Sequence, residues 1–294
     1  MMAEKEILAK IAFIGGSGLY EIDGIEDLVE KEIDTPFGKP SDKITIGSIN
    51  GIKCAFLPRH GKGHVFLPSE INQRANMYAL KSIGVEQIVA FTACGSLKEK
   101  MKPRNFVIPD QIFDRTKNRP NTFFGDGIVA HVGMAKPFCD EIRDIIHQSV
   151  YELGIEHHFG GTYVCIDGPQ FSTKAESEAN RQQGFSIVGM TAVPEAKLAR
   201  EAEICYANIS LVTDFDVWKD GEEVTNDAVA AVAAANISNS RRVIRDLVAK
   251  LALRRPQCCC RNALRTAVMT APEKLLVSPA YGKLALFLDK YYSK

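Results

Sequence analysis

The sequence predicts an α/β fold of one domain, with a central mixed, largely parallel sheet flanked by helices. Short apolar segments of strand length alternate along the chain with longer segments whose apolar residues recur at helical spacing, as in parallel sheets. The 294 residues contain no internal repeat or low-complexity linker. Hydrophobic residues make up 46% and charged residues 24%, as in ordinary globular proteins. We expect residues 1–254 to form the domain and residues 255–294 to be a C-terminal extension packed on it.

Strands are expected where short apolar runs end at turn-forming residues. The clearest pair flanks Asn50-Gly51, because Asn-Gly is the strongest short signal for a β-hairpin. The expected strands span residues 10–14, 44–46, 53–57, 87–92, 106–108, 163–166, 185–190 and 204–212.

Helices are expected in the longer segments between these strands. Residues 69–83 carry apolar side chains at helical spacing, and Ser69 can cap the start. A long helix begins at Thr225 or Asn226 and ends before Pro256, because the residue before a proline avoids the helical region. Further helices are expected at residues 139–153 and 174–183 and after Pro194.

The charges of the chain balance, with 36 Lys and Arg residues against 36 Asp and Glu residues. A neutral chain has no overall electrostatic attraction to nucleic acid or to an anionic membrane, so we expect neither as a partner. No segment approaches the roughly 20 apolar residues of a membrane span, and the start of the chain lacks the features of a signal peptide. We therefore expect a cytoplasmic protein.

The residues that follow the expected strands predict the position of a site. In sheets of this kind, ligands bind beyond the carboxyl ends of the strands. The residues at those ends are rich in hydroxyl groups, glycines and charged side chains, which suit an oxyanion held beside a polar heterocycle. They are Gly15–Gly18, Arg59–Gly61, Thr92–Gly95, Met190-Thr191 and Thr213–Asp216.

Four donors in this set predict a binding site for inorganic phosphate. They are the hydroxyls of Ser17, Thr92 and Thr191 and the guanidinium of Arg59, whose fork of N–H groups suits a tetrahedral oxyanion. Each feature alone also has a plain explanation, such as a strand-exit turn, a surface arginine or an ordinary strand threonine. The glycine-rich segment matches neither the dinucleotide fingerprint nor a Walker loop.

Asp214 and Asp216 form the sharpest local feature. Two carboxyls two residues apart can face one pocket if the backbone is extended. A metal site is one alternative, but no His or Cys lies at ligand spacing, and a surface turn is another. In an apolar pocket, one carboxyl can be held protonated and donate to a ring nitrogen.

Seven segments, spread in one order over roughly residues 10–253, resemble the S-methyl-5′-thioadenosine phosphorylases, which belong to the trimeric purine nucleoside phosphorylase superfamily. The segments are Ile14–Leu19, Asp34–Asp42, Arg59–Gly61, Thr92–Leu97, Gly168–Ser172, Gly189–Glu195 and Thr213–Trp218. The resemblance implies phosphorolysis of 5′-methylthioadenosine to adenine and 5-methylthioribose 1-phosphate, with inversion at the anomeric carbon. Inorganic phosphate is then a co-substrate, no organic cofactor or metal is needed, and the protein is a homotrimer that can pair into a dimer of trimers.

The resemblance also implies roles for single residues. Those matching the phosphate site are Ser17, Arg59, His60, Thr92, Ala93 and Thr191. Those matching the nucleoside site are Phe171, Ser172, Met190, Asp214, Asp216 and His131, the last reaching the 5′-thiomethyl pocket of a neighbouring subunit. Asp214 is the expected catalytic acid, and Ser172 and Asp227 are expected to set specificity. The family usually has Arg where this chain has Gln170, so we do not place Gln170 in the site.

Three other functions compete with this expectation. An inosine or guanosine phosphorylase on the same fold should favour an amide where this chain has Asp214 and Asp216, because a 6-oxo purine presents an acceptor. A dinucleotide-dependent oxidoreductase would need the three-glycine fingerprint. A non-catalytic purine-binding module would lack phosphate-dependent release of adenine.

The eight cysteines fall into two groups. Five are scattered among apolar neighbours, and we expect buried reduced thiols at residues 54, 94, 139, 165 and 205. The run Cys258–Cys260 follows the long helix. Its Cys-x-Cys element resembles that of thermophilic archaeal members of the family, where it forms a disulfide; free thiols are the alternative, and a zinc site lacks other ligands nearby in the sequence.

Overall fold

The computed structural model describes residues 7–16, 18, 24–219 and 226–292, without the side chains of residues 226–231. Its strands form one sheet and are β1 (Ile11–Gly15), β2 (Glu26–Lys31), β3 (Ile44–Ile49), β4 (Ile52–Pro58), β5 (Gln87–Ser96), β6 (Phe106–Ile108), β7 (Gln111–Asp114), β8 (His157–Phe159), β9 (Thr162–Cys165), β10 (Ile187–Gly189) and β11 (Cys205–Asp214). Its α-helices are α1 (Gln73–Ser82), α2 (Asp140–Glu152), α3 (Lys174–Gln182), α4 (Ala192–Glu201), α5 (Asn226–Leu253), α6 (Pro272–Leu275) and α7 (Tyr281–Tyr292).

The pairing of the described strands confirms a mixed, largely parallel sheet. Strands β1, β4, β5 and β11 run parallel in the order β4-β1-β5-β11, and β7, β9 and β10 form a second parallel group. Antiparallel pairs lie at the margins, where β2 and β3 continue from β4 and where β6 joins β11. The sheet therefore has a parallel centre, and its carboxyl ends gather at one edge.

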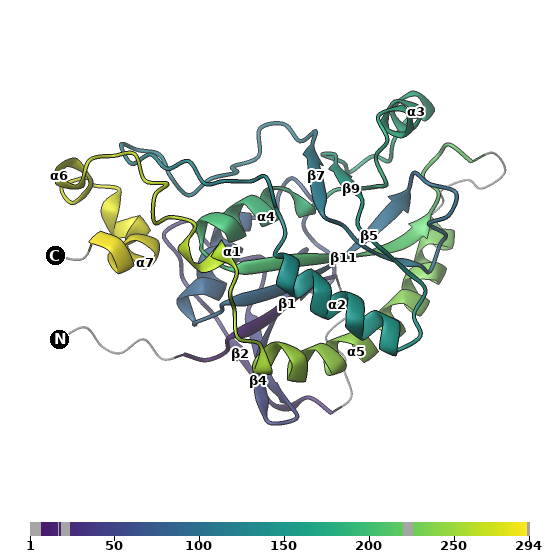
Figure 1. Ribbon diagram of the computed structural model, residues 1–294, viewed down its shortest axis with the longest axis horizontal. Helices are drawn as coiled ribbons and strands as arrows, with labels where there is room; N and C mark the ends of the chain where they lie inside the picture. The colour runs from purple at the N-terminus through teal and green to yellow at the C-terminus, as the bar shows by residue number, and fades with distance from the viewer. Residues whose placement is uncertain (1–6, 17, 19–23, 220–225, 293–294) are drawn as a thin grey trace.

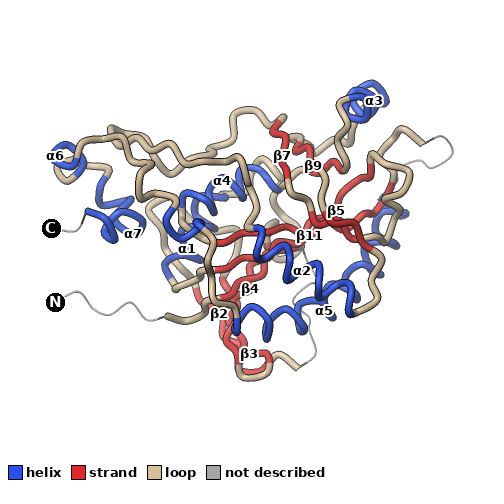
Figure 2. Tube along the Cα trace, in the orientation of Figure 1, coloured by secondary structure: helices blue, strands red, loops and turns tan. Residues whose placement is uncertain are grey.

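Helices cover both faces of the sheet (Figures 1 and 2). Because side chains alternate along a strand, Ile11 and Phe13 of β1 pack with residues of α2 and α5, whereas Ala12 and Ile14 pack with residues of α1 and α4. Segments after α5 join the second of these cores, through the buried Leu264, Leu275, Leu284 and Phe287. The C-terminal segment thus shares the hydrophobic core beneath α1.

Strand β5 pairs with different strands along its length, and the exchange of neighbours marks a place where a ligand can bind. Its first residues, Gln87–Ala90, pair with β1, which ends at Gly15. Its last residues, Gly95 and Ser96, pair instead with β10 in the antiparallel sense. The point at which β1 stops and β10 takes over is a topological switch point, where α/β sheets bind ligands.

Most expected elements are confirmed, and the differences have local causes. The hairpin forms at Asn50-Gly51, where both residues have positive φ. The first helix begins at Gln73 rather than near Ser69, because Asn72 caps it by accepting a hydrogen bond from Ala75 N at 3.1 Å. Strand β2 was not expected, since all six of its residues are exposed and it lacks an apolar face.

None of the helices in the described ranges combines the length and the apolarity that crossing a bilayer would require.

Candidate active site

A cavity of about 360 Å³ lies at the carboxyl ends of the parallel strands, beside the switch point. Ten of the site residues predicted from the sequence line it. They are Arg59, His60, Thr92, Ala93, Phe171, Ser172, Met190, Thr191, Asp214 and Asp216. Residues up to 157 positions apart in the chain are thus brought to one place, as the strand-end rule predicts.

Three predicted residues are not placed in this cavity. Ser17 and the side chain of Asp227 lie outside the described residues, although Gly16 beside Ser17 lines the cavity. His131 is exposed and lines a separate hollow of about 460 Å³ together with Phe124 and Lys197. Within one chain, His131 therefore has no part in the wall of the predicted site.

Asp214 and Asp216 both reach the cavity, but the extended backbone expected between them is wrong. Asp214 ends β11, and Asp216 lies in a turn with a positive φ of 53°. The turn directs the backbone N–H of Asp216 to Asp214 Oδ1, at 2.7 Å, while the Thr213 hydroxyl lies 2.7 Å from Asp214 Oδ2. A tight turn, rather than a strand, therefore sets the two carboxyls side by side.

Burial raises the pKa of both carboxyls. For Asp214, loss of solvent is the largest cause, hydrogen bonds from Thr213 and the Asp216 N–H oppose it, and the negative charge of Asp216 adds to it. For Asp216, burial again dominates, and the hydroxyls of Ser177 and Ser172 lower the pKa in part. Both groups therefore hold a proton more readily than an exposed aspartate does.

One oxygen of Asp216 has no hydrogen bond of good geometry among the described residues, although the hydroxyls of Ser172 and Ser177 are near enough to the carboxyl to lower its pKa. The residue is 4% exposed, and the atom concerned is Oδ2. A buried carboxylate oxygen without a partner costs free energy, on the order of 1–3 kcal/mol. Because the residue lines the cavity, a ligand that donates a hydrogen bond can supply the partner.

Gly95 of β5 makes room for the aspartate turn. A Cβ atom at this position would lie 2.9 Å from Asp214 Oδ1 and 3.3 Å from Asp216 Cα. A second glycine acts in the same way near the cavity wall: a Cβ at Gly168 would lie 2.3 Å from the Met190 sulfur. Both glycines allow a close approach that any larger residue would prevent.

Arg59 is held by a buried ion pair that the sequence analysis missed. The residue follows β4 and is 2% exposed; its Nε and Nη2 atoms lie 2.7 and 2.9 Å from the two carboxylate oxygens of Glu195, and Nη1 donates to Phe91 O at 3.0 Å. Tyr206 donates to the same carboxylate at 2.7 Å. The two-pronged pair fixes the guanidinium in the cavity wall and balances its charge.

His60 offers the cavity a neutral imidazole. Its Nδ1 atom lies 2.8 Å from Phe66 O, and burial lowers its pKa to about 4. Near neutral pH the proton therefore sits on Nδ1 and is donated to the carbonyl, which leaves Nε2 as an acceptor. His64, which the sequence analysis did not name, also lines the cavity and stacks on His60 with ring centres 4.2 Å apart.

The two cavity threonines differ in their surroundings. Thr92 is buried, and its hydroxyl lies 3.2 Å from Asn208 Oδ1 and 3.4 Å from Ser210 Oγ, both on β11. Thr191 begins α4 without a side-chain hydrogen bond to the first N–H groups of that helix. The backbone at Val193 is not helical (φ −119°, ψ 133°), so the regular helix begins after it, and Thr191 brings its hydroxyl rather than a helix start to the cavity.

A second hollow of about 290 Å³ continues the cavity towards α5. The two share Gly16, His64, Phe91, Ala93 and Thr213. The added wall is largely apolar and consists of Leu211, Ala233, Asn236 and Ile237. The site therefore has a polar region near Asp214 and Arg59 and an apolar extension beside the long helix.

Phe171 and Ser172 form the rim of the cavity beside Asp216. Phe171 is 47% exposed and Ser172 9% exposed, so the ring lies at the mouth and the hydroxyl inside. Gln170 lines a neighbouring surface hollow instead of the cavity. This placement agrees with leaving Gln170 out of the site.

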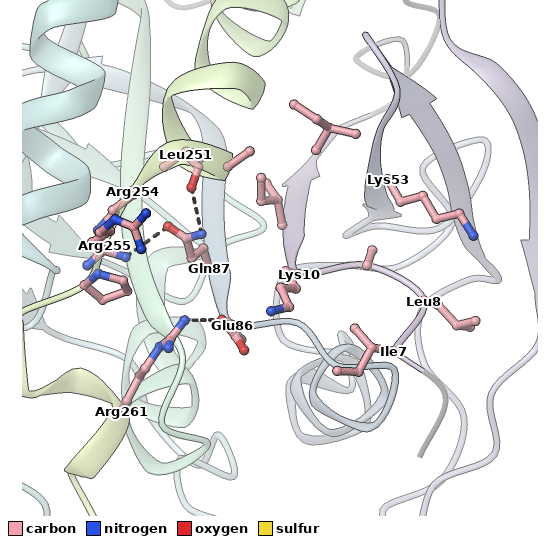
Figure 3. A pocket seen from close by; sticks show the side chains of 15 residues that line it. Ile7, Leu8, Lys10, Lys53, Glu86, Gln87, Leu251, Arg254, Arg255 and Arg261 are labelled. Carbon is pink, nitrogen blue, oxygen red and sulfur yellow. Dashed lines mark hydrogen bonds and ion pairs between the residues drawn. The ribbon is translucent and has the colours of Figure 1, made fainter. Parts of the chain in front are cut away.

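A different cavity, of about 550 Å³, lies at the amino ends of the same strands (Figure 3). It is bounded by the segment before β1, by the start of β5 and by the segment after α5, and Figure 3 shows Arg254 and Arg261 on one side of it. Arg254 donates to Gln87 Oε1 at 2.9 Å, and Arg261 pairs with Glu86. Arg254 with Gln87 and Arg261 with Glu86 thus form polar pairs across the strand starts.

The chain is similar to proteins of one family along almost its whole length. Residues 10–249 match the phosphorylase superfamily. A protein of Koribacter versatilis named S-methyl-5′-thioadenosine phosphorylase is 48% identical over 287 residues, covering 97% of this chain and 98% of that protein. The chain belongs to the S-methyl-5′-thioadenosine phosphorylase family.

Solved structures of this family share the fold. A methylthioadenosine phosphorylase from an antarctic soil metagenomic library matches with a TM-score of 0.93 at 47% identity, covering 96% of this chain and all of that one (100%). The methylthioadenosine phosphorylase of Schistosoma mansoni in complex with adenine matches with a TM-score of 0.83 at 36% identity, covering 90% of this chain and 100% of that one.

Proposed function

We propose that the protein catalyses the reversible phosphorolysis of 5′-methylthioadenosine to adenine and 5-methylthioribose 1-phosphate. The observation that carries the proposal is the pair Asp214 and Asp216, two carboxyls with raised pKa values in the same cavity as Arg59 and His60. Membership of the family and the adenine bound by the Schistosoma mansoni relative support the same function.

Asp214 is suited to protonate the leaving purine. Its neighbour Thr213 has one hydroxyl proton but lies within hydrogen-bond distance of two oxygens, Cys94 O at 3.2 Å and Asp214 Oδ2 at 2.7 Å. If Thr213 donates its proton to Cys94 O, the short contact with Asp214 needs a proton from the other side. A protonated Asp214 supplies it by donating a hydrogen bond to the Thr213 hydroxyl. When a nucleoside binds, the same proton can turn to purine N7, and it is transferred as the N-glycosidic bond breaks.

Asp216 is suited to recognise a 6-amino group. Its buried Oδ2 atom needs a donor, and the exocyclic amine of adenine supplies one. A 6-oxo purine would instead place a carbonyl oxygen against the carboxylate, with two acceptors opposed. An unpaired buried contact of that kind costs about 1–3 kcal/mol, or roughly a tenfold to hundredfold preference for the aminopurine.

Phosphate is the attacking group, so no protein nucleophile is required. We assign its binding to Ser17, Arg59, His60, Thr92, Ala93 and Thr191. As the N-glycosidic bond breaks, its electron pair goes to the purine and a phosphate oxygen forms the new bond to the anomeric carbon. The Nε2 atom of neutral His60 can accept a hydrogen bond from the hydroxyl of hydrogen phosphate, which orients the attacking ion. Neither bond change calls for a metal or an organic cofactor.

The apolar hollow beside α5 is the proposed place of the 5′-thiomethyl group. Leu211, Ala233 and Ile237 give it walls that favour a thioether over a 5′-hydroxyl. His131 is exposed outside the cavity of its own chain, so it can act at this pocket only from a second copy. We therefore propose that the protein is a homotrimer. Two such trimers can pair into a dimer of trimers. We also propose that the protein works in the cytoplasm.

A substrate panel with and without phosphate tests the proposal. Methylthioadenosine, adenosine and inosine are supplied at equal concentrations, and release of the free base is followed by chromatography. We expect release only with phosphate, with methylthioadenosine the best substrate. Equal cleavage of inosine would replace the proposal by an inosine phosphorylase, and binding without release would make the protein a purine-binding module. Light scattering on the same sample measures the assembly, for which we expect three chains or six.

A further inference from the structure

Four cysteine thiols come together at the end of β11 that lies away from the active site. The Sγ atoms of Cys139, Cys205, Cys258 and Cys260 all lie within 4.8 Å of one another. Three of the residues are buried and Cys258 is half-buried. The sequence shows only the Cys-x-Cys pair, so the argument that zinc lacks further ligands nearby is wrong: the fold supplies Cys139 and Cys205.

We propose that this thiol cluster binds one zinc ion as a structural tetrathiolate site. Four cysteine sulfurs are the common ligand set of structural zinc. With Zn–S bonds of about 2.3 Å, the sulfurs of a tetrahedron lie about 3.8 Å apart, close to the spacing of the cluster. An iron–sulfur cluster places several atoms between its thiolates and needs sulfurs farther apart.

The backbone holds the four ligands in place from three elements. Cys205 begins β11, and Cys139 directly precedes α2, where its N–H donates to Tyr206 O at 2.8 Å. The Cys-x-Cys loop is tied to α2 as well, because Gln257 N donates to Glu141 Oε1 at 3.0 Å. The ligand set is therefore preorganised by contacts that do not involve the sulfurs.

Two arginines offer the charge that a tetrathiolate site requires. Arg254 Nη2 lies 3.4, 3.7 and 3.2 Å from the sulfurs of Cys139, Cys205 and Cys258, and Arg200 Nη1 lies 3.4 Å from Cys260 Sγ. Four thiolates and one Zn²⁺ carry two negative charges, which the guanidinium groups of Arg200 and Arg254 offset in part, because Arg254 also pairs with Glu141. N–H···S hydrogen bonds of this kind orient metal-bound thiolates.

Both arginines also contact groups outside the thiol cluster. Glu141 lies 2.7 Å from the same Nη2 atom of Arg254 that contacts three of the sulfurs, and Arg200 Nη2 donates to the backbone oxygen of Lys136 at 2.5 Å. In Figure 3, Arg254 points from the segment after α5 towards Gln87 at the start of β5. The arginine thus joins the thiol cluster to the sheet.

Disulfide bonds are the competing chemistry for the same sulfurs. All eight cysteines are free in the structure, and Cys205 Sγ and Cys258 Sγ are 3.4 Å apart, compared with about 2.05 Å in a disulfide. A disulfide joins sulfurs in pairs, whereas the cluster brings four to a common centre. Binding of zinc would release the thiol protons and fasten the segment after α5 to α2 and β11.

Metal analysis of the whole protein tests the proposal. The protein is purified without chelators, reduced, and loaded with Zn²⁺ or Co²⁺ as the probe, with metal content measured by mass spectrometry. We expect one ion per chain, and with Co²⁺ the absorption bands of tetrahedral thiolate ligation. Zn²⁺ should also protect Cys258, the half-buried member of the cluster, from alkylation under native conditions, whereas the exposed Cys259 should react with or without the ion.

Matched variants make the outcome specific. Cys258→Ser and Cys260→Ser should lose the stoichiometric ion and the thermal stabilisation that it gives, whereas Cys259→Ser, exposed and between them in the sequence, should keep both. If a Cys260→Ser protein does not fold, Cys258→Ser in the half-buried loop position gives the same readout. The proposal is overturned if the reduced protein binds no ion, if Cys259→Ser loses it equally, or if non-reducing mass spectrometry finds these four cysteines joined as disulfides in the isolated protein. Phosphorolysis assays are not part of this readout, so its failure leaves the proposed function untouched.

Discussion

Strand β11 carries a group of ionisable side chains at each end, and the two groups are built in opposite ways. At the carboxyl end, Asp214 and Asp216 face a cavity, and Asp216 Oδ2 lacks a partner among the described residues. At the amino end, about 30 Å away along ten residues of strand, the Cys205 cluster is enclosed by arginines that contact each sulfur. At the carboxyl end, a transient ligand can supply the missing hydrogen bond. The enclosed thiol cluster at the amino end contributes instead to stability.

Replacing Asp214 by Asn should have the largest effect on the carboxyl end. The amide keeps a hydrogen-bond donor but cannot transfer a proton to the leaving purine, so we expect kcat for methylthioadenosine to fall by about 10²–10⁴-fold. The preference of the enzyme for methylthioadenosine over inosine should become smaller. Steady-state kinetics with both nucleosides measure the effect, with Cys259→Ser as the control that should retain full activity. A variant with near-normal turnover would remove Asp214 as the catalytic acid.

Replacing Glu195 by Ala should cost both stability and phosphate binding. The change leaves the Arg59 guanidinium buried without its carboxylate, and breaking a buried pair costs about 3–5 kcal/mol. We expect a lower free energy of unfolding in urea and a higher KM for phosphate, because Arg59 loses its orientation. The solvent-exposed pair Lys39 and Glu32 provides the control: Glu32→Ala should change the free energy of unfolding by less than about 1 kcal/mol.

Replacing Gly95 by Ala should displace the aspartate turn without removing any polar group. The new Cβ would meet Asp214 Oδ1 at 2.9 Å, and overpacking of this kind costs about 1–3 kcal/mol. We expect a clear fall in kcat/KM and only a small fall in the melting temperature. Gly133→Ala is the matched control, since a Cβ there meets no atom within 4 Å. Equal kinetics in the two variants would contradict the close fit of β5 against the turn.

Replacing Ser172 by Ala should give the smallest effect, which is best seen in the pH dependence. The Ser172 hydroxyl lowers the pKa of Asp216, so its loss raises that pKa further. Because the proposed acceptor of the 6-amino group is the Asp216 carboxylate, the acid limb of kcat/KM should move to higher pH, while the plateau changes by less than about tenfold. A pH profile from about 4 to 9 measures the shift, and an unmoved acid limb would separate Ser172 from Asp216.

The parts of the fold and site that could be predicted from the sequence are those set by local pattern. The hairpin at Asn50-Gly51 follows from the turn residues alone, and the strand-end rule placed Arg59 and Asp214 at one edge. The Glu195 partner of Arg59 lies 136 positions away, and the packing of α4 against β11 brings it there. The thiol cluster was hidden for the same reason, since two of its members come from distant elements.

Predictions from local sequence pattern were also wrong where the backbone conformation is unusual. The Asp-x-Asp spacing suggested a strand, but Asp216 adopts a positive φ that the sequence letters do not reveal. Strand β2 has six exposed residues and pairs only along one edge, so it lacks the apolar alternation by which strands are recognised.

The ion pair of Arg59 and Glu195 determines how a dianion can enter the site. Seen from solvent, a buried guanidinium with a carboxylate 2.7 Å away is a dipole, whose field fades with distance much faster than that of a single charge. Long-range attraction therefore contributes little to the encounter. Discrimination between phosphate and other oxyanions falls instead to the last few ångströms, where shape and the directions of the N–H and O–H groups decide which ion stays.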